Sequence, residues 1–248
     1  MVKKGFRPVF RGGTLKHRHR AGSASEQYRD RRRNHMDIDN LTKKVEPKKT
    51  AFIIIDMQKD YCCEGGVFHR TGFDVEISKA LAARISLFLV QARKVLKHIV
   101  HFKMTKVACL TSPAALEHYQ RHGLERHYDP SFSDFYEPVP IEGDVVIPKY
   151  RHSGFISTYF EQFLRINDIK TLILTGLATN VCVESTARDG FARDFHIVVP
   201  EELTEGTNPE AKKWSLINID NSFGEVVKSN DLLQCWRLEA INFSALKK

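Results

Sequence analysis

The stretch TLILTGLATNVCVESTARDG, residues 171–190, contains the pattern that decides the fold of this chain. An apolar run reaches a glycine, a short polar turn follows, and the next segment has apolar residues at helical spacing. A strand, a turn and a helix in this order are typical of a βαβ unit. Cys182 lies at the start of the helical segment, where unpaired N–H groups and the helix dipole favour a thiolate. The stretch therefore predicts a parallel sheet and a nucleophile at its edge.

The same alternation of short apolar runs and longer amphipathic segments extends over the chain from residue 50. It predicts an α/β fold with three layers, α/β/α, around a mostly parallel open sheet of six strands. The predicted strands are residues 51–55, 98–102, 144–148, 171–175, 196–199 and 225–227. The predicted helices are residues 74–96, 155–167, 180–193, 209–221 and 231–238. Residues 103–140 show no clean period, which predicts long loops around a site.

The length of 248 residues, with 42% hydrophobic residues, predicts one sizeable domain and a tail. We expect residues 1–46 to form a basic, disordered tail and residues 47–248 to form the domain. No apolar run is long enough to span a membrane, and no secretory signal follows the start. The five cysteines are unevenly spaced, which predicts reduced thiols inside a cell. We therefore expect an intracellular, cytoplasmic protein.

The net charge of +8 belongs to the tail. Residues 1–36 hold eleven Lys or Arg and two acidic residues, a net of +9, which leaves −1 for residues 37–248. The tail has few large apolar residues, so it cannot bury enough surface to offset the entropy of ordering. Four interpretations stay open: a solvated extension, a mitochondrial presequence, a nuclear signal around residues 29–33, and an anchor for RNA or an anionic membrane.

Three polar residues follow three of the predicted strands: Asp56, Lys149 and Cys182. Ligands gather at the carboxyl ends of parallel strands, so we expect these side chains to lie together. Each alone has an ordinary explanation: Asp56 as a helix cap or Mg²⁺ ligand, Lys149 as a solvated lysine, and Cys182 as a structural cysteine. Together they can open an amide, because Lys149 would lower the pKa of the thiol and Asp56 would take its proton. N–H groups of the turn at residues 176–179 would hold the oxyanion, and water would then resolve a thioester.

Three separated motifs carry a family resemblance. They are DMQ at residues 56–58, PKYRHSGF at 148–155 and TGLATNVCVESTARDGF at 175–191. Over about residues 47–235 the chain resembles the isochorismatase-like cysteine hydrolase family. With GGVFHRTGFDV at residues 65–75, it is most similar to the ureidoacrylate amidohydrolases of pyrimidine degradation.

The resemblance implies a catalytic triad of Cys182, Asp56 and Lys149. It also implies an oxyanion hole from the N–H groups of Ala178 and Cys182, and a cis peptide bond between Leu177 and Ala178. It further implies a homodimer or homotetramer.

The sequence departs from related families after the second strand. Nicotinamidases carry an Asp-x-His metal site there, whereas this chain reads FKMTK at residues 102–106, so we expect no metal and no cofactor. Ureidoacrylate enzymes have Asn and Trp at this place, where Met104 and Lys106 stand. Three further residues are candidates for substrate binding: Arg151 for a carboxylate, Asn180 at the oxyanion turn, and Gln58 for a water. His152 is open between lining a pocket and lying in a solvated loop.

The sequence thus predicts a metal-independent cysteine amidohydrolase that cleaves a C–N amide bond of a small linear ureido or carbamoyl compound, similar to ureidoacrylate. A nicotinamidase-like or biuret-like amidase is the alternative within the enzyme class. A non-catalytic member that binds nucleic acid or acidic surfaces through residues 1–36 is the alternative outside it.

Overall fold

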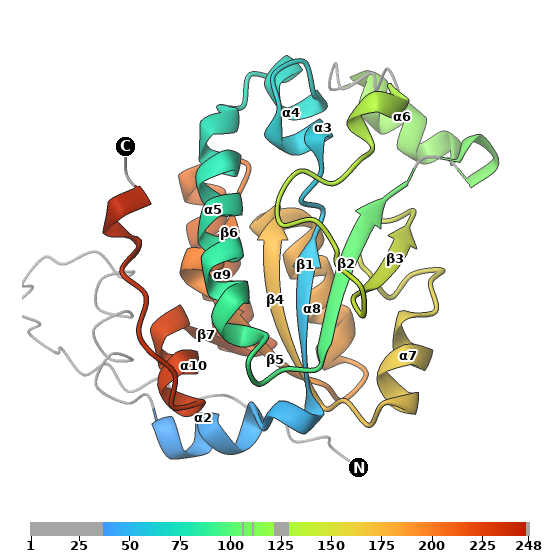
Figure 1. The fold of residues 1–248 in the computed structure, drawn as a ribbon. Helices are drawn as coiled ribbons and strands as arrows, with labels where there is room; N and C mark the ends of the chain where they lie inside the picture. The colour runs from blue at the N-terminus through green and yellow to red at the C-terminus, as the bar shows by residue number, and fades with distance from the viewer. Residues whose placement is uncertain (1–36, 106, 111, 122–128, 247–248) are drawn as a thin grey trace, which may run out of the picture. The chain divides into compact units, whose positions relative to one another are not determined.

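The computed structural model of this protein describes residues 37–105, 107–110, 112–121 and 129–246. Within these residues the chain forms a parallel sheet of seven strands in the order β3-β2-β1-β4-β5-β7, with β6 paired to β4 (Figure 1). The strands are β1 (Thr50–Ile55), β2 (His98–Met104), β3 (Val145–Lys149), β4 (Thr171–Leu177), β5 (His196–Pro200), β6 (Thr204–Glu205) and β7 (Glu225–Val227). All strand pairs run parallel, so their carboxyl ends meet at one edge of the sheet.

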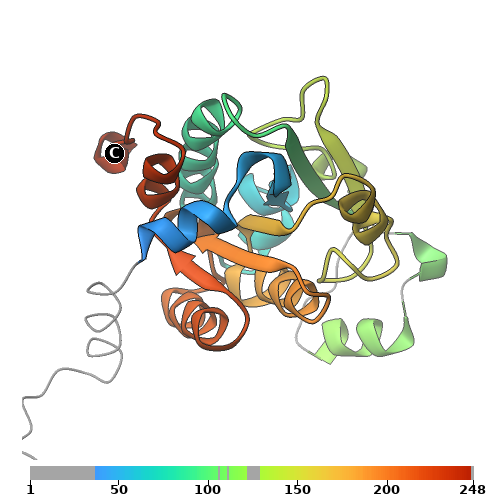
Figure 2. The same ribbon diagram turned by 90° about the horizontal axis from the view of Figure 1, so that it is seen from below.

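Helices cover both faces of the sheet, as Figures 1 and 2 show. One face packs against α2 (Ile38–Lys44), α5 (Val75–Ala92) and α10 (Ser229–Cys235). The other packs against α7 (Phe160–Ile166), α8 (Glu184–Phe191) and α9 (Pro209–Ser222). Alternate residues of β1 point to opposite faces, Phe52 toward α5 and Ile53 toward α8, so the central strand belongs to both cores.

The helices at the carboxyl edge are short. They are α3 (Lys59–Cys62), α4 (Val67–Arg70) and α6 (Pro113–Arg121), and they lie beyond the arrowheads of the strands in Figure 1. Short 3₁₀ helices lie at Pro47–Lys49, Ala108–Leu110, Pro130–Phe132, Glu201–Leu203 and Phe243–Leu246. In the described part of the chain, no helix is long and apolar enough to cross a membrane.

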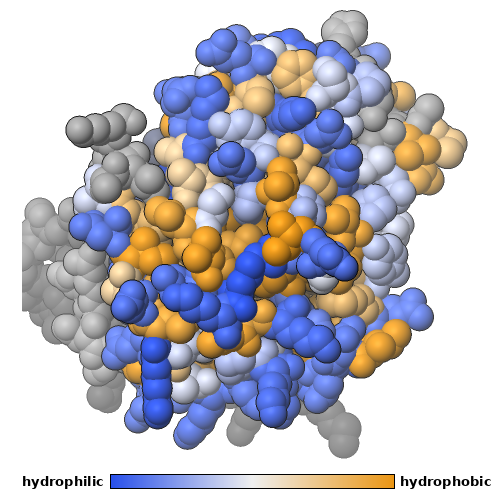
Figure 3. All heavy atoms as spheres, in the orientation of Figure 1, coloured by the Kyte–Doolittle hydropathy of each residue, from blue (hydrophilic) through white to orange (hydrophobic). Residues whose placement is uncertain are grey.

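Figure 3 shows the face that α5 covers, where apolar atoms lie among hydrophilic ones. Leu87 and Val90 of α5 are exposed there, at 43% and 62%. Scattered apolar side chains of this kind are normal on protein surfaces.

The structure corrects three predictions about the sheet and its helices. The sheet has seven strands rather than six, because β6 is two residues long and leaves no apolar run in the sequence. The helix predicted at residues 155–167 begins only at Phe160, since Ser157 has a left-handed backbone with φ of 57°. Residues 103–140 contain α6, which buries none of its described side chains and so shows no apolar period.

The predicted boundary of the tail at residue 46 is also wrong, because the folded unit begins at Ile38. Leu41 and Val45 are fully buried in the core. The indole Nε1 of Trp236 donates a hydrogen bond to the carbonyl oxygen of Val45 at 2.9 Å. These contacts join residues 38–46 to the domain, whereas every interpretation of residues 1–36 lies outside the described residues.

Candidate active site

The carboxyl edge of the sheet brings together three residues, one from the end of each of β1 and β3 and one from the turn after β4. Lys149 ends β3, and its ammonium Nζ lies 2.8 Å from Oδ2 of Asp56. The same Nζ donates hydrogen bonds to Sγ of Cys182 at 3.4 Å and to the carbonyl oxygen of Arg151 at 3.1 Å. All three N–H donors of the ammonium are thus used. Asp56, Lys149 and Cys182 are all buried.

Asp56 is held in an unusual backbone conformation. Its φ is 55°, in the left-handed region that costs a non-glycine residue about 1–2 kcal/mol. Its N–H donates to the carbonyl oxygen of Phe102 at 3.3 Å, and its own carbonyl accepts from Gln58 at 2.8 Å. Strain of this kind at the end of a central strand marks Asp56 as a functional candidate.

The turn after β4 places Cys182 against the end of β1. Gly176 has a φ of +100°, and a Cβ added there would lie 2.2 Å from the carbonyl oxygen of Ile55. Only glycine allows this close approach. The peptide bond between Leu177 and Ala178 is cis, as the resemblance implied.

Cys182 lies in a π-helical turn, Thr179–Val183, that continues into α8. The helix predicted at residues 180–193 therefore becomes an α-helix only at Glu184. Ser215 of α9 donates its hydroxyl to the carbonyl oxygen of Thr179 at 3.0 Å, which fixes the turn. π turns of this kind often occur at functional sites.

The resting cysteine is a thiol rather than a thiolate. Burial, followed by the negative charge of Asp56, raises the pKa of Cys182 to about 12, although Lys149 opposes both effects. Lys149 thus lowers the thiol pKa as expected, but burial and the charge of Asp56 outweigh its effect in the resting site. Burial on its own would lower the pKa of Lys149, but the carboxylate charge of Asp56 opposes burial, and the pKa of Lys149 lies above its usual value. A stable ammonium beside Asp56 leaves the thiol proton to be removed during the reaction.

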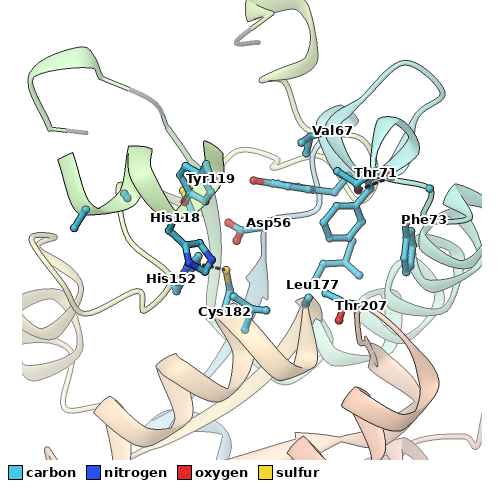
Figure 4. A pocket seen from close by; sticks show the side chains of 18 residues that line it. Asp56, Val67, Thr71, Phe73, His118, Tyr119, His152, Leu177, Cys182 and Thr207 are labelled. Carbon is cyan, nitrogen blue, oxygen red and sulfur yellow. Dashed lines mark hydrogen bonds between the residues drawn. The ribbon is translucent and has the colours of Figure 1, made fainter. Parts of the chain in front are cut away.

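Asp56 and Cys182 line a cavity of about 780 Å³ (Figure 4). Its remaining lining is mostly apolar and aromatic, and comes from the short helices at the carboxyl edge and from the turn after β4. The other lining residues are Tyr61, Val67, Phe68, Thr71, Gly72, Phe73, Met104, Ala114, Ala115, His118, Tyr119, His152, Leu177, Ala178, Val181 and Thr207.

His152 is a pocket residue, which decides the question that the sequence left open. Its Nδ1 lies 3.8 Å from Sγ of Cys182, the contact drawn as a dashed line in Figure 4. Figure 4 places His118, Tyr119 and His152 on one side of Asp56 and Cys182, and Phe73 on the other. The cavity thus has a polar side and an aromatic side.

Gln58 and Arg151, the predicted contacts to a water and to a substrate carboxylate, are not among the lining residues of this cavity. The amide of Gln58 donates to the carbonyl oxygens of Met104 and Ser133, and its Oε1 accepts from the N–H of Met104 at 2.7 Å. It holds two loops together and has no N–H left for a water. The guanidinium of Arg151 donates to the carbonyl oxygen of Leu110 at 2.9 Å on the surface.

Asn180 lies outside the pocket lining and hydrogen-bonds to a residue that lines it. Its Nδ2 donates to the hydroxyl of Thr207 at 3.0 Å, and its Oδ1 accepts from the N–H of Thr207 at 2.9 Å. Thr207 lines the cavity, whereas Asn180 does not. Asn180 therefore positions Thr207.

Sequence reasoning missed the aromatic lining of the pocket. Phe68 and Phe73 lie within the GGVFHRTGFDV motif, which carried the resemblance but was given no role. His118 and Tyr119 lie in α6, where no apolar period pointed to an element.

The carboxyl end of β2 offers no carboxylate or imidazole for a metal, since Lys103, Met104 and Thr105 stand there. Across the ranges that the structure describes, no group of three or more His, Cys, Asp or Glu is arranged to hold an ion.

Comparison with known proteins agrees with this arrangement. Residues 50–231 match the model of the isochorismatase domain. The chain belongs to the isochorismatase family. The match covers the sheet from β1 to β7 and all three residues that meet at its edge.

Solved structures with this fold include a cysteine hydrolase from Pseudomonas syringae pv. phaseolicola, with 25% identity, a TM-score of 0.67, and coverage of 78% of this chain and 95% of the other. An isochorismatase-like hydrolase from Alkaliphilus metalliredigens shares 26% identity at a TM-score of 0.62, with 76% and 99% of the chains covered. The N-carbamoylsarcosine amidase of Thermoplasma acidophilum shares the fold at 22% identity and a TM-score of 0.58, with 73% and 97% covered.

Proposed function

We propose that this protein is a cysteine amidohydrolase that cleaves the C–N bond of a small amide through a thioester on Cys182. The observation that carries the proposal is the position of the Lys149 ammonium, within hydrogen-bond distance of both the Asp56 carboxylate and the Cys182 sulfur. Similar structures named cysteine hydrolase and N-carbamoylsarcosine amidase support the reaction class.

The first half of the reaction forms the thioester. Asp56 takes the proton of the Cys182 thiol while the sulfur attacks the carbonyl carbon of the amide. The Lys149 ammonium, already bonded to the sulfur, stabilises the negative charge as it develops. The C–N bond then breaks as Asp56 gives the same proton to the departing nitrogen, which leaves as an amine or ammonia.

The second half returns the enzyme to its resting state. Asp56, again a carboxylate, takes a proton from a water molecule that attacks the thioester carbon. The C–S bond breaks, the carboxylic or carbamic acid leaves, and the thiol is restored. In both halves the oxygen of the tetrahedral intermediate would accept hydrogen bonds from the N–H groups of Ala178 and Cys182, two pocket residues of one turn.

Every group in this scheme is a side chain or a main-chain N–H, so we propose that the reaction is metal-independent. The carboxyl end of β2 fits this scheme, since Lys103, Met104 and Thr105 include no carboxylate or imidazole. No cofactor is needed to balance the hydrolysis.

Ureidoacrylate is one candidate substrate, and nicotinamide and biuret are others. The position of Arg151 weakens the case for ureidoacrylate, because the guanidinium expected to hold its carboxylate is bonded to Leu110. A non-catalytic protein that binds RNA or acidic membranes through residues 1–36 is the second candidate function, and the basic composition of that segment favours it.

Ammonia release by chelator-treated protein tests the proposal. Wild type, Cys182→Ala and Cys182→Ser are compared on ureidoacrylate, biuret, nicotinamide and uncharged carboxamides. We expect release by the wild type alone, because a serine hydroxyl in the same place is harder to deprotonate and less nucleophilic than a thiol. Turnover by either variant, or loss of turnover after chelation, contradicts the mechanism.

A further inference from the structure

We propose that the substrate of this site is an uncharged amide that carries an aromatic or similarly bulky apolar group. The group would lie against an aromatic wall, formed by Tyr61, Val67, Phe68 and Phe73. The inference rests on the proposed function and names the class of substrate that the cavity selects.

The aromatic wall is assembled before any substrate arrives. Tyr61 and Phe68 pack edge to face with ring centroids 5.0 Å apart, and Phe68 and Phe73 pack at 4.9 Å. The main chain fixes the same segment, because the N–H of Phe73 donates to the carbonyl oxygen of Phe68 at 2.9 Å. The N–H of Val67 donates to Oδ1 of Asp60, also at 2.9 Å. A preformed wall of this kind binds a flat ring with little loss of entropy.

The charges of the described lining residues favour an uncharged substrate over an anionic one. Among its described lining residues there is no lysine or arginine, and the carboxylate of Asp56 faces the space. The guanidiniums of Arg70 and Arg151 donate to main-chain oxygens, Arg70 to Gly65 at 2.6 Å and Arg151 to Leu110 at 2.9 Å. A carboxylate in the cavity would lose part of its hydration, and the ammonium of Lys149 beneath it is already paired with Asp56.

The two sides of the cavity orient the amide. The aromatic wall takes the apolar group, and the polar end of the amide lies toward the opposite side, where His118 and His152 line the cavity (Figure 4). Cys182 lies between the two sides, so a substrate held in this way presents its carbonyl carbon to the sulfur.

Alkylation of Cys182 tests the proposed preference for uncharged aromatic compounds without needing turnover. The full-length protein is treated at pH 8, where an ordinary imidazole is neutral, with iodoacetamide, N-benzyl-2-iodoacetamide or iodoacetate. Peptide mass spectrometry follows the labelling of Cys182, and the exposed Cys109 serves as an internal reference for the reactivity of each reagent.

Labelling rates of Cys182 are expressed relative to Cys109. On this scale we expect the benzyl reagent to react about 30-fold faster than iodoacetamide, because one face of its phenyl ring is buried against the aromatic wall. Iodoacetate should label Cys182 at least about tenfold more slowly than iodoacetamide on the same scale. Phe68→Ala should reduce the benzyl preference below about fivefold. The matched control is Phe163→Ala, which removes an equally half-buried ring that packs on His98 outside the cavity.

The proposal is overturned if iodoacetate labels Cys182 as fast as iodoacetamide, or if Phe68→Ala keeps the full benzyl preference. Amide hydrolysis that depends on Cys182 but favours anionic substrates would overturn it as well, and would leave the proposed reaction intact. Hydrolysis that survives in Cys182→Ala would instead refute the proposed function, whatever the alkylation rates show.

Discussion

Replacing Lys149 with methionine removes a buried cation and keeps most of the side-chain volume. Lys149 is fully buried, and its ammonium lies 2.8 Å from the carboxylate of Asp56. The variant leaves that carboxylate in the interior without its partner. Removing one member of a buried ion pair destabilises a protein by about 3–5 kcal/mol.

The destabilisation has an upper limit that follows from titration. At pH 7, protonating an ordinary aspartyl carboxyl costs about three pKa units, or about 4 kcal/mol. A buried carboxylate whose desolvation costs more free energy than this takes up a proton instead. We therefore expect Lys149→Met to lose about 4 kcal/mol of unfolding free energy at pH 7, and less of it as the pH falls toward 4.

Urea denaturation followed by tryptophan fluorescence measures this loss, and the melting temperature should fall by about 8–16 °C. The double variant Asp56→Asn/Lys149→Met has no buried charge left at the pair, so it should recover most of the stability without recovering amide hydrolysis. The reasoning is refuted if Lys149→Met is as stable as the wild type, or if the double variant is no more stable than the single one.

Three further predictions concern the surroundings of the site. Burial lowers the pKa of His101 to about 4, so between pH 6.5 and 4 the unfolded state binds a proton that the folded state does not. Urea denaturation should show that the wild type loses up to about 3 kcal/mol of unfolding free energy over this range, and that His101→Gln loses less. Gly176→Ala should lower the folding equilibrium constant and kcat/KM by at least about tenfold each. Gly143→Ala, at a φ of +93° in open space, should lower the free energy of unfolding by only about 1 kcal/mol. Gln58→Leu should cost about 2–4 kcal/mol of unfolding free energy, because the main-chain groups of Met104 lose their partners; a variant of normal stability with impaired hydrolysis would restore the water-binding interpretation.

The sequence was most informative where burial and local geometry act together. The strands are parallel and the central ones are buried on both faces, so apolar runs located six of the seven strands. The residues at the ends of these runs marked the edge of the sheet. Asp56, Lys149 and Cys182 could be paired from sequence because parallel topology brings strand ends together.

Side-chain partners could not be predicted in the same way. Gln58, Arg151 and Asn180 lie close to the site in sequence, but each hydrogen-bonds to groups elsewhere, at Met104, Leu110 and Thr207 respectively. Nothing in the spacing of residues indicates which main-chain oxygen a long polar side chain will reach.

The pocket walls and the thiol pKa depend on packing. Phe68, Phe73 and His118 meet at the cavity only after α4 and α6 fold over the edge of the sheet. The pKa of Cys182 rises because burial outweighs the neighbouring ammonium, and the extent of burial is a property of the folded chain.

Trapping the acyl-enzyme with hydroxylamine tests the central claim most directly. During hydrolysis of an amide substrate, a thioester on Cys182 should react with added hydroxylamine, so the wild type should release a hydroxamate in place of part of the acid. The account predicts hydroxamate from the wild type and none from Cys182→Ala. Hydrolysis by the wild type that yields acid alone at every hydroxylamine concentration, or hydroxamate from Cys182→Ala, would contradict it.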